Sequence, residues 1–296
     1  MTNLRDIRLR MRTIRQTLQV TKALNLISTA KLRKGRRLLE DTEPYFGRIQ
    51  KSMFDILSGM NDIESEFIHR SDSLKTSRKA ILVITSDRGL AGGYNANVFR
   101  YVNDLCSKLE NPVLIIIGSV GYRYFIHSSH IILENFSFHS KIPDVEHAKE
   151  IADYLFSQYL WGAFDEVHVV YTHMFSTFKL LPTEHQILPL NKEKIQAELS
   201  ETGSEQRTAL QFEFIPSVTE VFNTLVPLYV RGQIYGCMVE AWVSEQSARM
   251  AAMDEASRSA QDMLSSLQIS YNRARQAGIT QEISEIVGGS TALAAK

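Results

Sequence analysis

The carboxyl-terminal third of the sequence has the pattern of one very long helix. No proline occurs after Pro227, and from residue 253 mostly small or apolar residues recur at alternating spacings of three and four. This repeat is typical of a coiled-coil seam, along which one helix packs against another. At 1.5 Å per residue, a helix from 228 to 287 is on the order of 90 Å long, which no globular domain of this size needs. The predicted seam residues are Met253, Ala256, Ala260, Met263, Leu267, Ser270, Ala274 and Ala277.

The amino-terminal segment has a seam of its own. It consists of apolar residues spaced by four, three and four, which are Ile7, Met11, Ile14 and Leu18. Beyond it, an apolar stripe and a polar stripe run side by side, which leaves the continuation of the seam open. The apolar stripe holds Ala23, Ile27 and Ala30, and the polar stripe holds Thr21, Asn25 and Ser28. We predict one helix from about residue 4 to residue 57, bent near Pro44, where a proline removes a backbone hydrogen bond.

Local signals mark the ends of the carboxyl-terminal helix. Ser217 and Glu220 have the spacing of a capping box, so a helix is expected to begin there. Pro227 is expected to restart the helix as a first-turn proline, and Gly288 and Gly289 predict its end. Just before these glycines, an apolar stripe shifted from the seam forms a candidate tip. Its residues are Ile279, Ile283, Ile286 and Val287.

Between the two helices, strand and helix patterns alternate. Apolar runs at 80–85, 112–117 and 166–171 predict buried strands, and the stretches 96–109 and 146–159 predict helices. Two further strands are predicted at 186–190 and 211–215, joined by a polar surface excursion over 191–208. The alternation indicates a Rossmann-like α/β domain with a largely parallel sheet.

The predicted architecture is an α/β domain inserted between two long terminal helices. Because each helix carries a narrow apolar seam, the two satisfy these seams best by pairing as an antiparallel coiled coil. The expected domains are an N-terminal coiled-coil helix at 1–60, an α/β globular domain at 78–216 and a C-terminal coiled-coil helix at 217–290.

Charge and cysteine content narrow the function classes. Lys plus Arg and Asp plus Glu both total 33, so the formal net charge is zero and gives no indication of a nucleic-acid partner. The first 37 residues are nevertheless basic, with eleven Lys or Arg against Asp6 alone. Because these charges share their turns with an apolar seam, we favour a solvated or protein-facing surface over a DNA-binding helix. Cys106 and Cys237 form no disulfide or metal pattern, and no apolar run approaches the ~20 residues that span a bilayer.

One motif raises the alternative of a nucleotide-binding α/β enzyme. The segment 86–95, SDRGLAGGYN, follows the first predicted strand and precedes a helix, where such folds hold phosphates. Its spacing matches neither the dinucleotide fingerprint nor the P-loop, so we expect a structural turn. The histidines of the α/β region lack ligand spacing, and no GxSxG is present, so no cofactor, metal or catalytic residue is predicted. A coiled-coil scaffold or nucleic-acid-binding protein is the other alternative.

Three separated segments resemble the gamma-subunit family of rotary ATP synthases. At the carboxyl end, QSARMAAMD at 246–254, YNRARQ at 271–276 and ITQEISEIVGG at 279–289 are similar to the family signature. At the amino end, VTKAL at 20–24 and AKLR at 30–33 resemble the opposing helix, although Leu24 stands where the family usually has methionine. The turn at 86–95 is also similar to a family pattern. The resemblance covers essentially the whole chain.

The resemblance implies a rotor shaft rather than an enzyme. Its implied partners are the alpha and beta subunits of the catalytic ring, the epsilon subunit and the membrane rotor ring. The residues that resemble ring-contacting positions are Leu24, Arg249, Arg275, Gln276, Thr280 and Glu282, and the apolar tip is expected to act as a bearing. Since the family-like helix begins within a few residues of Met1, we expect a bacterial protein that lies peripherally on the cytoplasmic face of the cell membrane.

Overall fold

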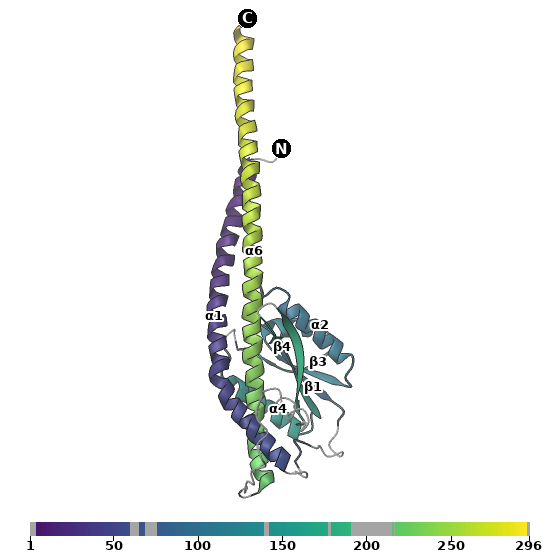
Figure 1. Ribbon diagram of the computed structural model, residues 1–296. Helices are drawn as coiled ribbons and strands as arrows, with labels where there is room; N and C mark the ends of the chain where they lie inside the picture. Colours follow the sequence, from purple (N-terminus) through teal and green to yellow (C-terminus); the bar gives the residue numbers. More distant parts are fainter. Residues whose placement is uncertain are drawn as a thin grey trace. The chain divides into compact units, whose positions relative to one another are not determined.

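The computed structural model describes residues 4–59, 65–68, 76–138, 142–176, 179–190, 215 and 217–294 (Figure 1). The chain divides into two compact units, which we call the helical unit (Met1–Ser28 with Arg249–Lys296) and the α/β unit (Thr29–Ala248). This division differs from the predicted domains, because it cuts both terminal helices instead of falling at their ends. Within the α/β unit, the half of the carboxyl-terminal helix packs with the sheet, bonding to the N–H of Met174 through Glu240, and the half of the amino-terminal helix packs against the carboxyl-terminal one.

Two long helices dominate the chain. α1 spans Leu4–Gly59 and continues past Pro44, and α6 spans Val218–Ala294. The capping box is confirmed on its first side, since the Ser217 hydroxyl accepts a hydrogen bond from the N–H of Glu220 at 3.2 Å. The predicted restart at Pro227 is wrong, because α6 runs through it while Phe222 and Val226 on the same turns are fully buried. The predicted end at Gly288 is also wrong, because α6 continues to Ala294. A glycine permits a helix to end, but within a helix it lowers the stability by only about 1 kcal/mol.

The five-stranded sheet has the order β3-β2-β1-β4-β5. Its strands are β1 (Lys79–Ile84), β2 (Pro112–Ile117), β3 (Ile131–Phe136), β4 (Glu166–Met174) and β5 (Leu180–Leu188). The first four are parallel, and β5 pairs antiparallel with β4. The Rossmann-like prediction is confirmed, while β3 was not predicted and β5 begins six residues before the predicted strand. The predicted strand at 211–215 and the excursion at 191–208 lie almost wholly outside the described residues.

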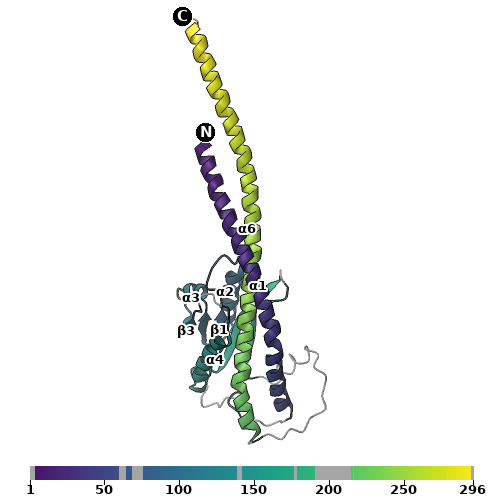
Figure 2. The same cartoon turned by 90° about the vertical axis from the view of Figure 1, so that its left-hand side faces the viewer.

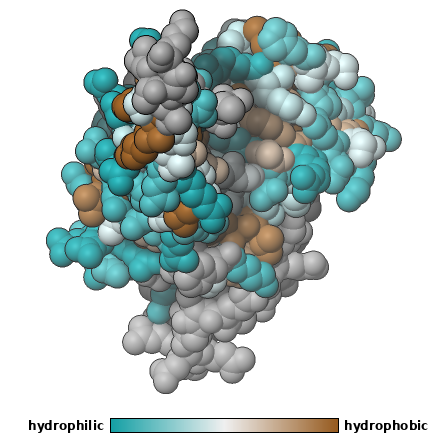
Figure 3. All heavy atoms as spheres, turned by 90° about the horizontal axis from the view of Figure 1, so that it is seen from above, coloured by the Kyte–Doolittle hydropathy of each residue, from teal (hydrophilic) through white to brown (hydrophobic). Residues whose placement is uncertain are grey.

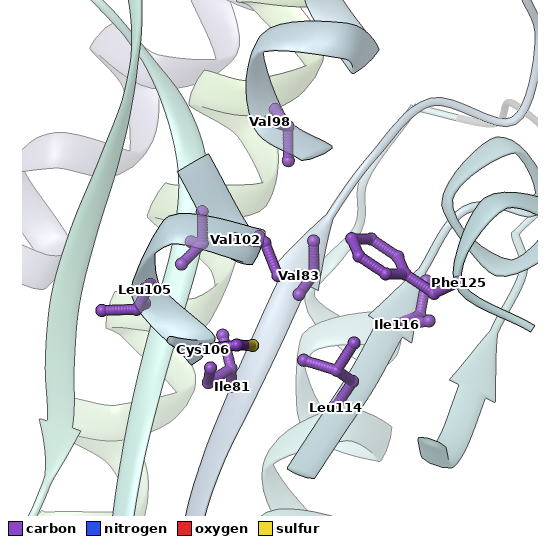
Figure 4. Close-up of a cluster of buried hydrophobic side chains, with 10 residues drawn as sticks. Ile81, Val83, Val98, Val102, Leu105, Cys106, Leu114, Ile116 and Phe125 are labelled. Carbon is purple, nitrogen blue, oxygen red and sulfur yellow. The ribbon is translucent and has the colours of Figure 1, made fainter. Parts of the chain in front are cut away.

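Helices α2 (Tyr94–Cys106) and α3 (Ser119–Phe125) pack on one face of the sheet. Figure 4 shows the buried cluster that joins them to the strands. It contains Ile81, Val83, Leu114, Ile116 and Val170 from the strands, with Val98, Val102, Leu105, Cys106 and Phe125 from the helices. Burying each such aliphatic side chain stabilises the fold by about 1.5–3 kcal/mol.

Helix α4 (Val145–Leu160) and part of α6 cover the opposite face (Figures 1 and 2). Strand side chains alternate between faces, so Leu82 and Ile115 point this way, and both are fully buried. Asp144 caps α4 by accepting from the N–H of His147 at 2.9 Å. Arg231 of α6 reaches Asp153 of α4 at 2.7 Å. The α/β unit therefore has its core on both sides of the sheet.

Candidate interaction site

Within the helical unit, α1 and α6 pair as antiparallel helices. Arg8 donates to the hydroxyl of Tyr271 at 2.8 Å, with its guanidinium 5.7 Å from the ring centre. Further along α1, Asn25 donates to the carbonyl oxygen of Met250 at 3.0 Å. The partner numbers on α6 fall as those on α1 rise, which defines the antiparallel direction.

On α1, the polar stripe continues the seam. Ile7 and Met11 are buried and Ile14 and Leu18 are half-buried, as is Leu24. Beyond them, Thr21 and Ser28 are buried while Ile27 is 52% exposed. The alternation of three and four residues thus passes through polar side chains, and the parallel apolar stripe faces away from α6.

On α6, one half of the predicted seam requires correction. Met253 and Ala260 are buried, and Leu267 and Ala274 are half-buried. The second column, however, lies one residue further along, at Ser257, Leu264, Tyr271 and Gly278. Met263, predicted in the seam, is 56% exposed. Ser257 lies beside Ala256 and Tyr271 beside Ser270, and both Ser257 and Tyr271 hydrogen-bond to side chains of α1.

The end of α6 has no helical partner among the described residues. An added Cβ at Gly278 would lie 4.0 Å from Leu4, the first described residue of α1, and every residue from 279 to 290 is exposed. Figures 1 and 2 show this extension in yellow. Ile279, Ile283, Ile286 and Val287 are between 48% and 71% exposed, and Glu282 and Glu285 are the only charged residues of the segment. We call residues 279–290 the tip.

The predicted ring-contacting residues differ in accessibility. Arg275 and Gln276 lie just before the tip, Thr280 and Glu282 lie within it, and all four are exposed. Arg249 is only 8% exposed, so most of its side chain is taken up inside the molecule. Elsewhere, the hydrophobic residues visible in Figure 3 are interspersed with hydrophilic ones. Most of the exposed residues among the predicted ring-contacting positions therefore lie together, in the tip and at the two polar residues just before it.

The segment 86–95 forms a self-bonded turn. The Asn95 side chain accepts from the N–H of Ser86 at 3.1 Å and donates to the Ser86 hydroxyl at 2.7 Å, and that hydroxyl donates to the carbonyl of Arg88. Asp87 accepts from the N–H of Ser119 at 2.9 Å, which joins the turn to α3. These polar groups hold the turn and its neighbours together.

Helix α6 occupies the place where an α/β fold of this order binds ligands. That place is the crevice at the carboxyl ends of β1 and β4, where the strand order reverses. There the Tyr94 hydroxyl donates to the carbonyl of Ala241 at 3.2 Å, and the N–H of Met174 donates to Glu240 at 3.3 Å. The cavity left beside β1 and β2, between Thr85 and Trp242, has a volume of only about 50 Å³. Typical ligand pockets measure roughly 300–1,000 Å³.

One cluster of charged and titratable side chains in the α/β unit links strands β1, β4 and β5 through Lys79, Glu166, His168 and Glu184. His168 lies between Glu166 and Glu184, at 2.9 and 2.7 Å. Burial alone would raise the pKa of Glu166, but hydrogen bonds and charge from His168 and Lys79 outweigh it, so the pKa is lowered.

In the described part of the chain, no three His, Cys, Asp or Glu side chains are arranged to bind a metal. Over the same residues, no helix combines the length and apolarity needed to cross a membrane.

Sequence patterns missed the residues that join the two helices by side-chain hydrogen bonds. Arg8, Thr21, Ser257 and Tyr271 are polar, and a search for apolar periodicity passes over them. The available signal was the polar stripe on α1, which keeps the heptad spacing of the apolar residues before it.

The fold and the exposed tip define a class of protein in which two long antiparallel terminal helices flank a Rossmann-like unit in the chain. A family model described as ATP synthase matches residues 3–293. The chain is 39% identical over 294 residues to the ATP synthase gamma chain of Acetivibrio thermocellus, covering 99% of this chain and 100% of the relative. With that of Ruminiclostridium cellulolyticum it shares 41% identity over 292 residues, covering 98% and 99%. The chain therefore belongs to the ATP synthase gamma-chain family.

A solved structure of low sequence identity shares the fold. It is described as the Euglena gracilis mitochondrial ATP synthase, OSCP/F1/c-ring, in rotational state 3. Its matching chain is 16% identical, with a TM-score of 0.67, and the match covers 99% of this chain and 95% of that one. The arrangement of long terminal helices around an α/β sheet is thus retained where little sequence is.

Proposed function

We propose that this chain is the central rotor shaft of a rotary ATP synthase. It turns inside a ring of alpha and beta subunits and couples ion-driven rotation of the membrane ring to the cycling of catalytic sites on the beta subunits. The observation that carries this proposal is the tip. A single unbroken helix extends an exposed apolar stripe beyond its partner and carries exposed polar residues directly before it.

The two kinds of surface at this end suit two tasks. Apolar contacts are non-directional, so an apolar tip in an apolar sleeve resists rotation weakly and serves as a bearing. Arg275, Gln276, Thr280 and Glu282 instead make directional hydrogen bonds, which favour particular angles. An asymmetric shaft that contacts three equivalent clefts differently shifts each of them toward a different closure state. Turning the shaft then redistributes these states.

The chain itself performs no catalysis in this proposal. The crevice in which its α/β unit would bind a nucleotide holds α6, with Tyr94 and Met174 bonded to that helix. The α/β unit instead joins the epsilon subunit and the membrane rotor ring. The assembled complex places this chain peripherally on the cytoplasmic face of the bacterial cell membrane.

The test is the double variant Arg275→Ala/Gln276→Ala in the assembled complex. Alanine preserves helix propensity while it removes polar contacts, each worth about 1.5–3 kcal/mol when one group is charged and less when both are neutral. We expect complexes with all subunits present and ATP-driven rotation or coupled synthesis reduced several-fold. Single-molecule rotation and proton-driven synthesis measure this.

Arg258→Ala/Gln261→Ala is the matched control. It removes the same two residue types from exposed positions of the same helix, where Arg258 pairs only locally with Asp254 at 2.8 Å. Control complexes should rotate at the wild-type rate. Normal rotation and coupling in the Arg275/Gln276 variant would remove these residues from the proposed contact, and failure of the wild-type chain to assemble with alpha and beta subunits would overturn the rotor proposal itself.

A further inference from the structure

The sequence of α6 carries two overlapping seams. Both share the column Met253, Ala260, Leu267 and Ala274. The observed second column contains Ser257, Leu264 and Tyr271, and the competing one, three residues after each shared position, contains Ala256, Met263 and Ser270. Successive helical residues are about 100° apart, so exchanging one column for the other rotates α6 about its own axis by about 50°.

At one level of the seam, the observed column buries a polar residue where the competing column offers an apolar one. The hydroxyl of Ser257 is buried, with its residue 9% exposed, in place of Ala256. At the next level, Leu264 and Met263 are similarly apolar, and Met263 is left 56% exposed. Burial of polar groups in a coiled-coil seam lowers stability in exchange for a defined arrangement of the helices. Apolar area therefore does not explain why Ser257 rather than Ala256 faces α1.

Two hydrogen-bonded pairs of side chains, which we call the ties, supply this preference. They are Thr21 with Ser257 and Arg8 with Tyr271. The hydroxyls of Ser257 and Thr21 lie 2.8 Å apart, in position to hydrogen-bond across the helices. Each carries one proton and also lies near a carbonyl of its own helix, Ser257 at 2.7 Å from Met253 and Thr21 at 3.1 Å from Leu18, so one of these own-helix bonds forms together with the bond between the hydroxyls. Arg8 donates to the hydroxyl of Tyr271 two heptads further along α6. A rotation that brought Met263 into the seam would carry both hydroxyls away from α1, which would leave Thr21 buried with its inter-helix bond broken.

We propose that Thr21, Ser257, Arg8 and Tyr271 are positioning residues. Their hydrogen bonds fix the rotation of α6 about its own axis relative to α1, which we call its rotational setting, and exclude the competing seam that contains Met263. The inference about setting stands on the helical unit alone. Its consequence for function rests on the proposed rotor role, because the same setting fixes the direction in which Arg275 and Gln276 face relative to α1.

The test traps the setting with cysteine pairs in full-length chain whose native Cys106 and Cys237 are replaced by alanine. One heptad from the Thr21–Ser257 tie, the equivalent positions are Ile14 and Leu264. Ile14→Cys with Leu264→Cys reports the observed setting, and Ile14→Cys with Met263→Cys reports the competing one. Because disulfide geometry is restrictive, the first pair should oxidise about tenfold faster than the second.

Thr21→Val/Ser257→Ala/Tyr271→Phe removes both ties while keeping side-chain volume nearly constant. We expect the ratio of the two oxidation rates to fall roughly fivefold as the competing setting becomes populated. Thr13→Val/Ser265→Ala is the control, since these exposed hydroxyls bond only to carbonyls of their own helices. It should leave the ratio unchanged, as should Thr21→Ser, which retains the hydroxyl.

A ratio within about twofold of wild type in the triple variant would overturn the proposal, because a setting held by packing alone survives loss of the ties. If the triple variant loses helix content, Thr21→Val and Tyr271→Phe are measured singly, and an unchanged ratio in both overturns it equally. The trapping ratio needs no assembled complex. A negative result therefore leaves the rotor proposal untouched, and failure of the rotor proposal leaves the ratio as it is.

Discussion

At the scale of single residues, Ala260 shows how closely the two helices of the helical unit approach. It is 6% exposed and lies in the column shared by both possible seams of α6. A longer side chain at this position has to enter the space that α1 occupies, and a charged one also loses its hydration.

Ala260→Glu should therefore weaken both folding and complex assembly. We expect the free energy of unfolding to fall by about 2 kcal/mol, because a carboxylate becomes buried without a partner. Thermal melting and assembly yield measure the effect. Gln261→Glu, at the adjacent exposed position, is the control and should behave as wild type. An Ala260→Glu chain that melts and assembles normally would show that this column does not face α1.

Glu240 gives the α/β unit a pH dependence of definite sign. Burial raises its pKa above 4.5, against opposing effects from His173 at 2.5 Å, the N–H of Met174 and Tyr171. The stability that it contributes is therefore fully present below pH 4.5 and is lost as the pH rises through the folded-state pKa. Glu240→Gln keeps an acceptor for Met174 but does not ionise. The unfolding free energy of wild type minus that of the variant should fall with rising pH. Urea unfolding at a series of pH values measures this difference, and a difference that grows with pH would contradict the prediction.

Residue patterns predicted the seam of α1 well only while that seam was apolar. Ile7 and Met11 are buried, but the same face continues through Thr21 and Ser28, which hydropathy assigns to solvent. On α6 one predicted column was displaced by a residue, to Met263 beside the similarly apolar Leu264. Which of two adjacent columns faces a partner depends on the packing and hydrogen bonds between the helices, and one helix's sequence does not contain them.

At the scale of elements, α1 holds a buried glycine that lets α6 come close. In the α/β unit, a Cβ on Gly35 would lie 2.5 Å from a methyl of Val243 and 2.8 Å from the ring of Trp242. Val243 is fully buried, so it has little room to move away. Gly47 lies in the same helix, and a Cβ there would meet nothing within 4 Å.

Gly35→Ala and Gly47→Ala should change stability in opposite directions. Both gain about 1 kcal/mol of helix propensity, but overpacking at Gly35 typically costs about 1–3 kcal/mol. We expect Gly35→Ala to destabilise the chain by about 1 kcal/mol and Gly47→Ala to stabilise it by up to about 1 kcal/mol. Chemical denaturation of the two variants measures this. Equal stabilisation by the two substitutions would mean that the side chains of Val243 and Trp242 move aside at little cost in free energy.

Long, regular elements were predictable, and short ones were not. The two terminal helices and the buried strands β1 and β2 follow from periodicity and apolar runs. α3 has seven residues, and its start is fixed by the Thr85 hydroxyl, which accepts from the N–H of Gly121 at 3.1 Å and donates to the carbonyl of Ile117. β3 is a half-exposed edge strand whose pairing with β2 is irregular. Such elements depend on tertiary contacts.

At the scale of the whole molecule, the α/β unit has the strand order of a nucleotide-binding fold but no phosphate-gripping motif in its sequence. The turn at 86–95 bonds to itself and to α3, and α6 fills the crevice. Fold and chemistry are therefore separable here, and the proposed function lies in the tip and not in the sheet.

The purified full-length chain should accordingly hydrolyse no ATP. Catalysis of phosphoryl transfer requires groups that position the phosphates and a magnesium ion, and no motif in this sequence supplies them. Phosphate release at saturating MgATP should equal that of a mock preparation. The complex reconstituted with alpha and beta subunits is the positive control, and turnover by the isolated chain above the mock level would contradict a non-catalytic role.

Helix α6 fills the crevice as a bound ligand would, and it is covalently part of the same chain. A tethered group is present at its site at an effective concentration in the millimolar range or above, whatever the concentration of the protein. Any small molecule aimed at the carboxyl ends of β1 and β4 must compete with this internal occupant and with the buried packing of Trp242 and Met238 beside it. An inhibitor screen against the isolated chain should therefore find its binders elsewhere on the surface.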